Sequence, residues 1–550
     1  FATKPSFLLT VAFAQRVGAL VSASALLGLL FAAALMPVVA LFRVPLAAKF
    51  ALLLARVPAA VLFAITALLL LDGFTVTLFR RGIRDARALP GRVLYGVLLL
   101  AFLALGYRLA CRLDRLFKER GRRRILAAVL VAAVAVLAAK ALAGAGRREP
   151  SGPGAASAAV RDHDIVLVGA DGLEAWRTSL YGNARDNTPF LRQMAESALV
   201  AETAYSNSGQ TTGSITSLLT GKLPTTTRVH YPPDALRSID QYEHLPGLLR
   251  RMGYRTFFAG VRNYADPLEL RLLDAFDEVG EVQIARPSLT RRVDVVTGAT
   301  AAHLLNLSTA RISERLAHVV LGVPMPDPKR QVSSGLAARE SDDDRFKALV
   351  RFLERPGGPK FAHAHFLGTH GPDFSPTRSV FSKLGKKAPH WDPDAQDDAI
   401  LDFDDRVREL FGLLDRLGRR DRTIVVVYSD HGQLYRLDVP VPLLFIFPPG
   451  GPRGRIRGAT QLVDVAPTLL QELGVPRPAW MQGTSLLGKD VGPCRSVLSA
   501  RSGGVVEQTT AGGLRIIYER PWYSLGHLAL IACSGTWWLY PEAGFTPREF

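Results

Sequence analysis

The stretch SNSGQTTGSITSLLTGKLP, residues 206–224, decides how the rest of this chain is interpreted. Ser214 to Thr220 predicts a helix that ends at Gly221, because glycine readily adopts the left-handed conformation that closes a helix. Thr211 would then lie just before the helix, where free backbone amides and the helix dipole favour an anionic group. Ser and Thr before an apolar run are equally typical of ordinary helix capping, so the stretch alone leaves both interpretations open.

Two runs of strand length lead into acidic residues. Asp164 to Ala170 reads DIVLVGA and precedes Asp171, and Thr423 to Tyr428 reads TIVVVY and leads into Asp430 and His431. Continuous apolar runs of this length predict parallel strands that are buried on both faces. The carboxyl ends of such strands face the ligand crevice of an open α/β sheet, so Asp171 and Asp430 are candidate metal ligands. Capping of a helix is the alternative role for Asp171.

A third predicted strand carries three histidines. The segment FAHAHFLGTHGP, residues 361–372, contains His363, His365 and His370. His363 and His365 fall on the same face of a strand and are interpreted as core residues. His370 follows the strand, beside a Gly-Pro pair, and is the candidate for contact with a substrate.

Helical patterns separate these strands and complete the predicted fold. Amphipathic helices are expected over residues 187–199, 242–254, 341–354 and 398–417, with Ser341 at the start of the third. The alternation of strands and helices predicts a doubly wound α/β domain with a central, mostly parallel sheet flanked by helices. Residues 288–340 interrupt the alternation and are expected to form a helical insertion.

The positive charge of the chain is concentrated in its first 150 residues. They hold 21 Lys and Arg against 5 Asp and Glu, whereas the remaining residues hold 46 against 44. These charges lie between apolar runs without interleaved aromatic residues, which argues against nucleic-acid binding. Four runs are long enough to span a membrane, at about 17–42, 57–78, 93–111 and 125–143. An N-terminal α-helical multi-pass membrane segment is therefore expected.

The connection between the last two expected spans predicts the orientation. Residues 108–124 carry eight Lys or Arg, which the positive-inside rule places in the cytoplasm. The domain that follows would then be extracytoplasmic, and the chain would be a multi-pass protein of the plasma (inner) membrane. The basic loop of residues 80–92 would be external in this arrangement, so the number of spans before it stays open.

Four parts make up the predicted organisation. They are a membrane domain with about four helices (1–143), a linker (144–161), an α/β catalytic domain (162–488) and a C-terminal subdomain (489–550). The linker is expected because residues 144–159 are small, contain Pro and have no apolar period. Cys494 and Cys533 both follow the linker, and a disulfide and two unpaired thiols are equally consistent with the sequence.

A parallel sheet would gather four polar residues at one edge: Asp171, Thr211, Asp430 and His431. A Thr hydroxyl is barely ionised at neutral pH, and a bound cation lowers the cost of its ionisation while neutralising phosphoryl oxygens. Oxygen ligands with one imidazole favour Mn, Mg or Zn and leave Ca open. One divalent metal ion is therefore the expected cofactor, with Thr211 as nucleophile.

Residues 164–550 resemble the alkaline phosphatase/sulfatase superfamily. The resemblance rests on VLVGADGLEAW, NTPFLRQMAESALVAETAYS, SLLTGKLP, VVVYSDHG, VPLLFIF and LVDVAPTLLQELGVP, which occur in the family's order, and on QGTSL at residues 482–486. The terminal WLYPEAGFTPREF is similar to a degenerate form of the sulfatase C-terminal segment.

Three departures from the sulfatase pattern point away from sulfate-ester hydrolysis. Thr211 to Ile215 stand where sulfatases carry Cys-x-Pro-Ser-Arg, so the Cys that becomes formylglycine and the Arg are both missing. Gly260 to Asn263 replace Gly-Lys-Trp-His, and Asp171-Gly172 replaces a pair of Asp residues.

A Thr nucleophile and several N-terminal spans are similar to the membrane phosphotransferases, namely lipoteichoic acid synthases, phosphoglycerol transferases and phosphoethanolamine transferases. That resemblance implies that the four gathered residues bind the metal and that Thr211 takes a phospho-head-group from a membrane lipid. It also implies that His370 contacts the phosphate and that a glycan or lipid outside the cytoplasm accepts the group. Thr212 is the alternative nucleophile, because the alignment can slip by one residue.

Two other functions remain open from the sequence. A hydrolase would use water as the acceptor and cleave a phosphodiester or a sulfuric ester. A non-catalytic membrane protein on a decayed enzyme fold would keep the fold without the chemistry, although the retained metal and nucleophile positions argue against it.

Overall fold

The computed structural model describes residues 163–283, 328–383 and 389–488 apart from single positions, residues 89–118, most of 56–72 and short segments elsewhere. The chain divides into two compact units. Residues 1–150 and 286–326 form one, and residues 151–285 and 327–550 form the other. Each unit is considered by itself.

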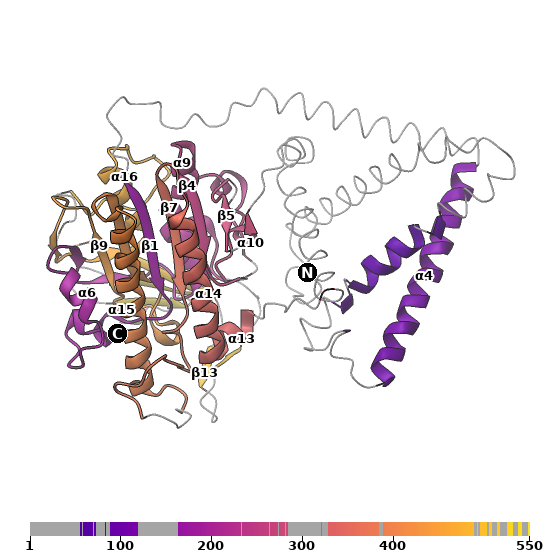
Figure 1. Cartoon of the computed structure of the whole chain (residues 1–550), viewed down its shortest axis with the longest axis horizontal. Helices are drawn as coiled ribbons and strands as arrows, with labels where there is room; N and C mark the ends of the chain where they lie inside the picture. Colours follow the sequence, from indigo (N-terminus) through magenta and orange to yellow (C-terminus); the bar gives the residue numbers. More distant parts are fainter. Residues whose placement is uncertain are drawn as a thin grey trace. The chain divides into compact units, whose positions relative to one another are not determined.

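The second unit is built on a central sheet (Figure 1). Among the described residues, nine strands form it in the order β10-β2-β9-β8-β1-β7-β4-β5-β6. Their bounds in that order are Gly454–Ile456, Leu199–Ala201, Leu443–Ile446, Thr423–Ser429, Asp164–Ala170, Lys360–Phe366, Arg255–Ala259, Glu278–Val279 and Val282–Gln283. The apolar runs of β1 and β8 thus form neighbouring central strands, as their sequences predict.

Most of the strand pairs are parallel. β1 pairs in parallel with β7 and β8, β7 with β4, β4 with β5, and β2 with β10. The antiparallel pairs are β8–β9, β2–β9 and β5–β6. The mostly parallel α/β sheet expected from the sequence is confirmed.

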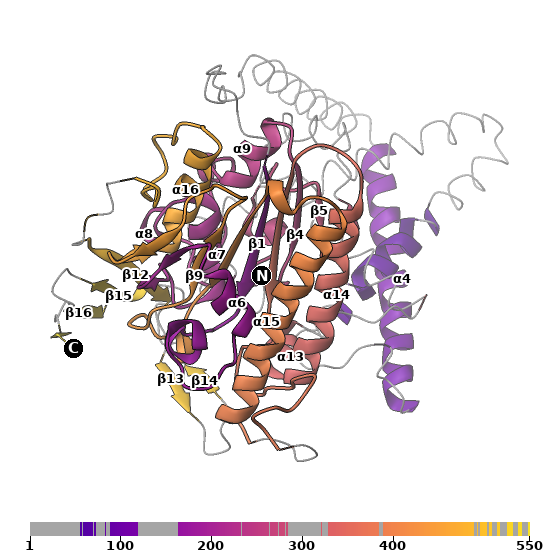
Figure 2. The same cartoon turned by 60° about the vertical axis from the view of Figure 1, so that its left-hand side comes forward.

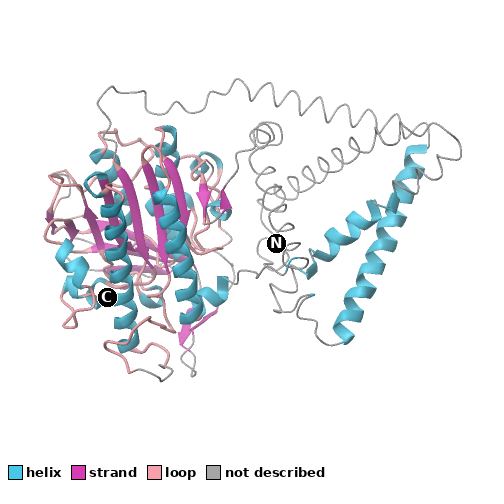
Figure 3. Ribbon diagram, viewed as in Figure 1, coloured by secondary structure: helices cyan, strands magenta, loops and turns pink. Residues whose placement is uncertain are grey.

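Helices cover both faces of the sheet, and β1 contributes alternate residues to the two cores (Figure 3). Ile165 and Leu167 pack with α7 (Thr211–Thr220), α9 (Leu245–Arg251) and α16 (Val465–Glu472). Val166 and Val168 pack with the helices of the opposite face, which are α6 (Pro189–Met194), α14 (Gly335–Glu354) and α15 (Pro393–Arg416). α14 and α15 lie side by side along that face (Figures 1 and 2). Burial of β1 on both faces explains its continuous apolar sequence.

Helix ends follow local sequence signals in some places and not in others. α7 ends at Gly221, whose φ is 66°, and α15 begins where the Asp392 side chain accepts a hydrogen bond from the Ala395 amide at 2.8 Å.

The helix expected from Ser341 begins earlier, at Gly335, and follows α13 (Pro328–Ser333). Asp342 therefore lies inside α14, where it accepts hydrogen bonds from the Leu367 and Gly368 amides instead of capping the helix. The expected insertion over 288–340 otherwise lies almost wholly outside the described residues.

Smaller elements complete this unit. The other helices are α8 (Pro224–Thr227), α10 (Pro267–Leu270) and the 3-10 turns at Ala175–Arg177, Ser179–Tyr181, Ser238–Gln241, Arg420–Arg422, Gln433–Tyr435 and Leu462–Asp464. The other strands are β3 (Ala204–Tyr205) with β11 (Thr460–Gln461), β13 (Val505–Gln508) with β14 (Leu514–Ile517), and the sheet β12 (Val497–Ser502), β15 (Leu525–Ile531), β16 (Trp537–Pro541) and β17 (Arg548–Glu549). Cys494 and Cys533 lie outside the described residues.

The first unit contains one described helix that is long and apolar enough to cross a membrane. Residues Val93–Arg112, within α4 (Leu89–Lys118), have a mean hydropathy of 2.0. A shorter apolar helix covers Ala59–Leu69 in the second expected span. The expected spans at 17–42 and 125–143 lie outside the described residues, so the multi-pass topology stays a prediction.

Candidate active site

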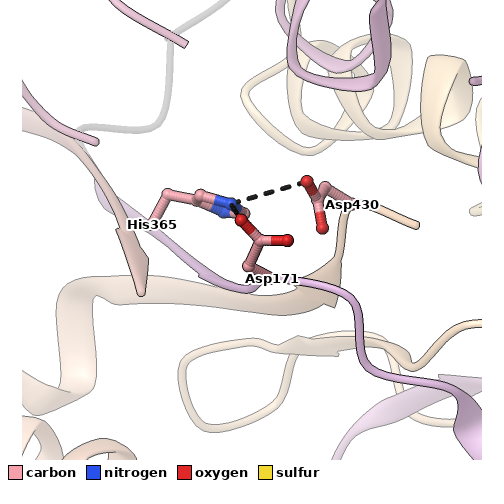
Figure 4. A group of neighbouring side chains, drawn as sticks. All are labelled: Asp171, His365 and Asp430. Carbon is pink, nitrogen blue, oxygen red and sulfur yellow. Dashed lines mark ion pairs between the residues drawn. The ribbon is translucent and has the colours of Figure 1, made fainter. Parts of the chain in front are cut away.

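Three adjacent strands bring two carboxylates and an imidazole together at the carboxyl edge of the sheet (Figure 4). Asp171 directly follows β1, Asp430 directly follows β8, and His365 is the second-last residue of β7. Because β1 lies between β8 and β7, the three side chains converge. His365 Nε2 lies 3.5 Å from both Asp171 Oδ2 and Asp430 Oδ2.

Backbone amides hold the Asp430 carboxylate. Its Oδ1 accepts hydrogen bonds from Gly172 N at 3.1 Å and His431 N at 2.9 Å. Its Oδ2 is buried and has no hydrogen-bond partner, and the same is true of Asp171 Oδ1. Each carboxylate thus keeps one oxygen free towards the centre of the site.

His431 supplies a second imidazole from the loop after β8. Its Nδ1 lies 2.8 Å from the Gly432 carbonyl oxygen, and because only a protonated nitrogen can donate to a carbonyl, Nδ1 carries a hydrogen. Its Nε2 lies 3.4 Å from Asp171 Oδ1 and 3.5 Å from Asp430 Oδ2.

The electrostatics of the site favour an ionised Asp171 carboxylate. Burial acts to raise the pKa of Asp171, but the nearby His370, His365 and His431 outweigh it and hold that pKa well below its usual range. Burial acts to lower the pKa of His365, yet Asp430 and Asp171 raise it above the ordinary histidine value. Asp171 therefore carries a negative charge although it is buried.

The residues present fit a divalent metal ion. Asp171 Oδ1, Asp430 Oδ2 and His365 Nε2 are buried without hydrogen-bond partners, and unpartnered buried polar atoms carry a large desolvation cost. One ligand atom from each of Asp171, His365 and Asp430 lies within 4.8 Å of the others. Atoms bound to one ion at about 2.1 Å lie roughly 3.4 Å apart in a tetrahedron, close to the 3.4 Å and 3.5 Å separations found between His431 Nε2 and the two carboxylates.

Thr211 faces this centre from the start of α7. Its Oγ1 lies 3.3 Å from His431 Nε2. The sequence placed Thr211 just before the helix, whereas it is the first helical residue, with Gln210 as the preceding cap residue. In either position it lies where the helix dipole and free amides favour an anion.

Several contacts fix α7 against the two loops of the site. Ser214 Oγ donates to the Asp430 carbonyl oxygen at 2.6 Å. A side chain at Gly213 would place a Cβ atom 2.5 Å from Ser208 Oγ, so the first turn of α7 requires glycine there. The Ser206–Gly209 segment is joined to β12 by hydrogen bonds between Gly209 N and Ala500 O and between Ala500 N and Asn207 O. Thr212 is also buried, and its Oγ1 has no hydrogen-bond partner.

His370 lies at the solvent side of the cluster. Its Nε2 is 4.0 Å from Asp171 Oδ1, and its side chain is 15% exposed, against 2% for Asp171 and for His431. This is a suitable place for a group that contacts the substrate.

The structure brings the predicted Asp171, Thr211, Asp430, His431 and His370 into one cluster and adds His365. The sequence assigned His363 and His365 to the core on the same strand face, and both are fully buried. Only His365 reaches the carboxylates. The available signal was its position one residue before the carboxyl end of β7, but the order of the strands is needed to see its partners.

The family model described as sulfatase matches residues 163–475. That segment is more than half of the chain, so the chain belongs to the sulfatase family, and the expectation of an enzyme is confirmed at the level of that family.

The chain is also similar to the following proteins. Arylsulfatase K of Bos taurus is 33% identical over 105 residues, which are 17% of this chain and 18% of that protein. Arylsulfatase K of Canis lupus familiaris is 24% identical over 399 residues, covering 64% of this chain and 71% of that protein. The structure of the phosphonate monoester hydrolase of Agrobacterium radiobacter is 17% identical in sequence, with a TM-score of 0.45. The match covers 70% of this chain and 90% of that chain. The chain spans less than a fifth of the curated relatives that it matches at more than 30% identity.

Proposed function

We propose that this chain is a metal-dependent transferase that carries a phospho-head-group on Thr211. The observation that supports the proposal most directly is the 3.3 Å approach of Thr211 Oγ1 to His431 Nε2 beside two buried carboxylates. A hydroxyl nucleophile in an anionic site needs a cation to ionise it. Carboxylate oxygens and imidazoles without hydrogen-bond partners are suitable ligands for that cation.

The proposed reaction has two steps. In the first, a bond forms between Thr211 Oγ1 and the phosphorus of a lipid phosphodiester, the bond from phosphorus to the lipid alcohol breaks, and the proton of Thr211 ends on that alcohol. In the second, the hydroxyl of the acceptor bonds to phosphorus, the bond to Thr211 breaks, and the acceptor's proton returns to Thr211. Phosphoglycerol and phosphoethanolamine are the proposed groups, and a glycan or lipid is the proposed acceptor.

Each residue of the site has a proposed role in this reaction. Asp171, Asp430, His431 and His365 would hold one divalent ion, together with Thr211. That ion would lower the cost of ionising the Thr211 hydroxyl and neutralise phosphoryl oxygens. The amino end of α7 adds partial positive charge to the place where the phosphate would sit. His370, 4.0 Å from Asp171 and partly exposed, would contact the phosphoryl group from the solvent side.

We place this reaction on the extracytoplasmic side of the plasma (inner) membrane. The support is the apolar helix Val93–Arg112 and the basic segment of residues 108–124, which holds eight Lys or Arg. A lipid donor would be within reach of a domain tethered there.

Hydrolysis of a sulfuric ester or phosphodiester is the second candidate function. It is favoured by membership of the sulfatase family and by relatives named arylsulfatase. It is opposed by Thr211 at the position where sulfatases carry a Cys. The two functions differ in the acceptor, which is water for a hydrolase.

The test compares Thr211→Ala with the wild-type chain in detergent. Products from phosphatidylglycerol, phosphatidylethanolamine and an aryl sulfate are identified by mass spectrometry, and the Thr211 peptide is examined for an added phospho-group. We expect Thr211→Ala to reduce product formation at least 1,000-fold, as loss of a nucleophile typically does, and to lose the modified peptide.

Thr212→Ala tests the alternative nucleophile and is the matched comparison, because Thr212 is adjacent and buried and its Oγ1 has no hydrogen-bond partner. It is expected to keep product formation within about threefold. Full activity of both Thr211→Ala and Thr212→Ala would eliminate the covalent mechanism, whereas loss of activity in Thr212→Ala alone would make Thr212 the nucleophile. Release of free sulfate from the aryl sulfate as the main activity would establish the hydrolase instead.

A further inference from the structure

Gly169 lies opposite two aromatic residues of the flanking strands. In the register of the sheet, Gly169 of β1 pairs with His365 of β7 on one side and with Tyr428 of β8 on the other. Side chains at paired positions of adjacent strands point to the same face. His365 and Tyr428 thus flank a position that has no side chain.

The missing side chain creates the space in which the two rings meet. A Cβ atom built on Gly169 would lie 2.5 Å from His365 Nδ1 and 2.5 Å from the Tyr428 hydroxyl oxygen. Both distances are well below van der Waals contact, so no other residue fits at position 169 with the rings in place. The ring centroids of His365 and Tyr428 are 6.3 Å apart and their planes are inclined by 24°.

Tyr428 is held in this position from its other end. Its hydroxyl shares a hydrogen bond of 2.6 Å with His363 Nε2, and both side chains are buried. His363 is in turn packed edge-on against Phe258, with centroids 4.9 Å apart. A short bond between two buried groups fixes the orientation of the phenol ring.

His365 itself has no hydrogen bond that would fix its ring. Neither Nδ1 nor Nε2 has a hydrogen-bond partner, whereas the ring of a metal-binding histidine is ordinarily oriented by a hydrogen bond from its second nitrogen. The two carboxylates attract Nε2 from one side, so on the Nδ1 side the ring is restrained by packing, and the ring of Tyr428 is its neighbour across the Gly169 gap.

We infer that Tyr428 is the positioning residue of the metal centre: bonded to His363 and admitted by Gly169, it keeps His365 Nε2 directed at Asp171 and Asp430. The inference rests on the metal site of the proposed function but not on the transfer reaction. Without the Tyr428 hydroxyl, the aromatic ring at position 428 is no longer hydrogen-bonded to His363 and can move. The His365 ring then gains rotational freedom, which metal binding must remove. Metal affinity falls as a result.

The experiment measures Mn²⁺ binding by isothermal titration calorimetry, on the full chain in detergent after chelation. We expect Tyr428→Phe to raise the Mn²⁺ dissociation constant about 10-fold or more, within the range found for residues that orient metal ligands. His363→Phe removes the other partner of the same bond and is expected to act in the same direction. It serves as the second variant if Tyr428→Phe does not fold.

Tyr254→Phe is the matched control. It also removes a tyrosine hydroxyl, which donates a part-buried hydrogen bond of 2.9 Å to the His163 carbonyl oxygen at the opposite end of β1. It should lower the Tm of the metal-free protein about as much as Tyr428→Phe and leave Mn²⁺ affinity unchanged. A purely structural role of Tyr428 would make the two variants alike in both measurements.

Two results would overturn the inference. One is Mn²⁺ affinity of Tyr428→Phe and His363→Phe within twofold of wild type. The other is unchanged affinity of His365→Ala, which would show that His365 does not bind the ion. Neither result depends on catalytic turnover, so failure of the Thr211 mechanism and failure of this inference are separate outcomes.

Discussion

His370 and His431 lie in one cluster with different surroundings. Their ring centroids are 6.3 Å apart, yet His431 Nε2 is within 3.5 Å of two carboxylates and Thr211, whereas His370 Nε2 is 4.0 Å from Asp171 and more exposed. Proximity alone would make both of them metal ligands. On the basis of exposure and distance, we propose His431 as a metal ligand and His370 as a contact to the substrate.

Replacement of His370 distinguishes these roles. We expect His370→Ala to lower kcat/KM about 100-fold, because a contact to the transferred group is lost in the transition state. Mn²⁺ affinity, measured by titration calorimetry, is expected to change less than threefold. His390→Ala is the control, because His390 is 35% exposed and paired with Asp373, and it should leave both quantities unchanged. A parallel loss of Mn²⁺ affinity in His370→Ala would make His370 a ligand.

At the level of single residues, the sequence predicts those parts of the site that follow a strand. Asp171, Asp430 and His431 were found because apolar runs end directly before them, and Thr211 because it precedes a helix. His365 is inside a strand, where an alternating pattern indicates only a face. Its partners belong to strands that are distant in sequence, so they become apparent only from the order β8-β1-β7.

The contact between α6 and α15 depends on the buried carboxylate of Asp404 in α15. Asp404 accepts hydrogen bonds from the Phe190 and Leu191 amides at 2.8 Å each, at the amino end of α6. Thr188, the residue directly before α6, makes no such bond with its side chain. The helix start is thus capped from another helix, which a local sequence pattern does not reveal.

Asp404 also makes the stability of this contact dependent on pH. Burial raises the pKa of Asp404 to about 6, although the Leu191 and Phe190 amides oppose the shift. A carboxyl whose folded pKa lies above its unfolded pKa adds stability at low pH and loses it as the pH rises through the folded value. We therefore expect the stability of wild type relative to Asp404→Asn to fall by about 2 to 3 kcal/mol between pH 4 and pH 7.

Thermal unfolding of both proteins at several pH values measures this difference. Asp394→Asn, in the same helix, is the control, because Asp394 is a 40% exposed residue paired with Arg185 and should change stability by less than about 1 kcal/mol throughout. A difference between wild type and Asp404→Asn that does not vary with pH would contradict the assignment.

The start of α14 shows a similar limit at the scale of elements. Ser341 and the acidic residues after it have the composition of a helix start, but the helix begins at Gly335. Asp342 is instead used to bind the Leu367 and Gly368 amides, at 2.9 and 2.7 Å, in the loop after β7. An N-terminal signal and a long-range contact look the same in the sequence, because both use a short acidic side chain next to free amides.

For the whole molecule, the sheet and its two covering layers were predictable, because apolar strands and amphipathic helices alternate along the chain. The division of the chain between membrane and catalytic parts rests on hydropathy and charge, and one helix of the described residues meets the length and hydropathy needed for a span. The proposal that a membrane lipid reaches the active site is therefore argued from hydropathy and charge in the sequence.

Metal removal should lower the stability of the catalytic unit as a whole, since the two buried carboxylates converge at the carboxyl edge of its main sheet. An ion that binds only the folded state contributes about 2.7 kcal/mol at a concentration 100 times its dissociation constant. We expect chelation to lower the Tm of the wild-type chain by a few degrees, and added Mn²⁺ to restore it.

In Asp430→Asn, the repulsion between the two carboxylates is relieved and one metal ligand is lost. The Tm of this variant without metal should therefore equal or exceed that of metal-free wild type and should not respond to chelation. An equal response of Asp430→Asn to the chelator would place the stabilising metal at another site in the chain.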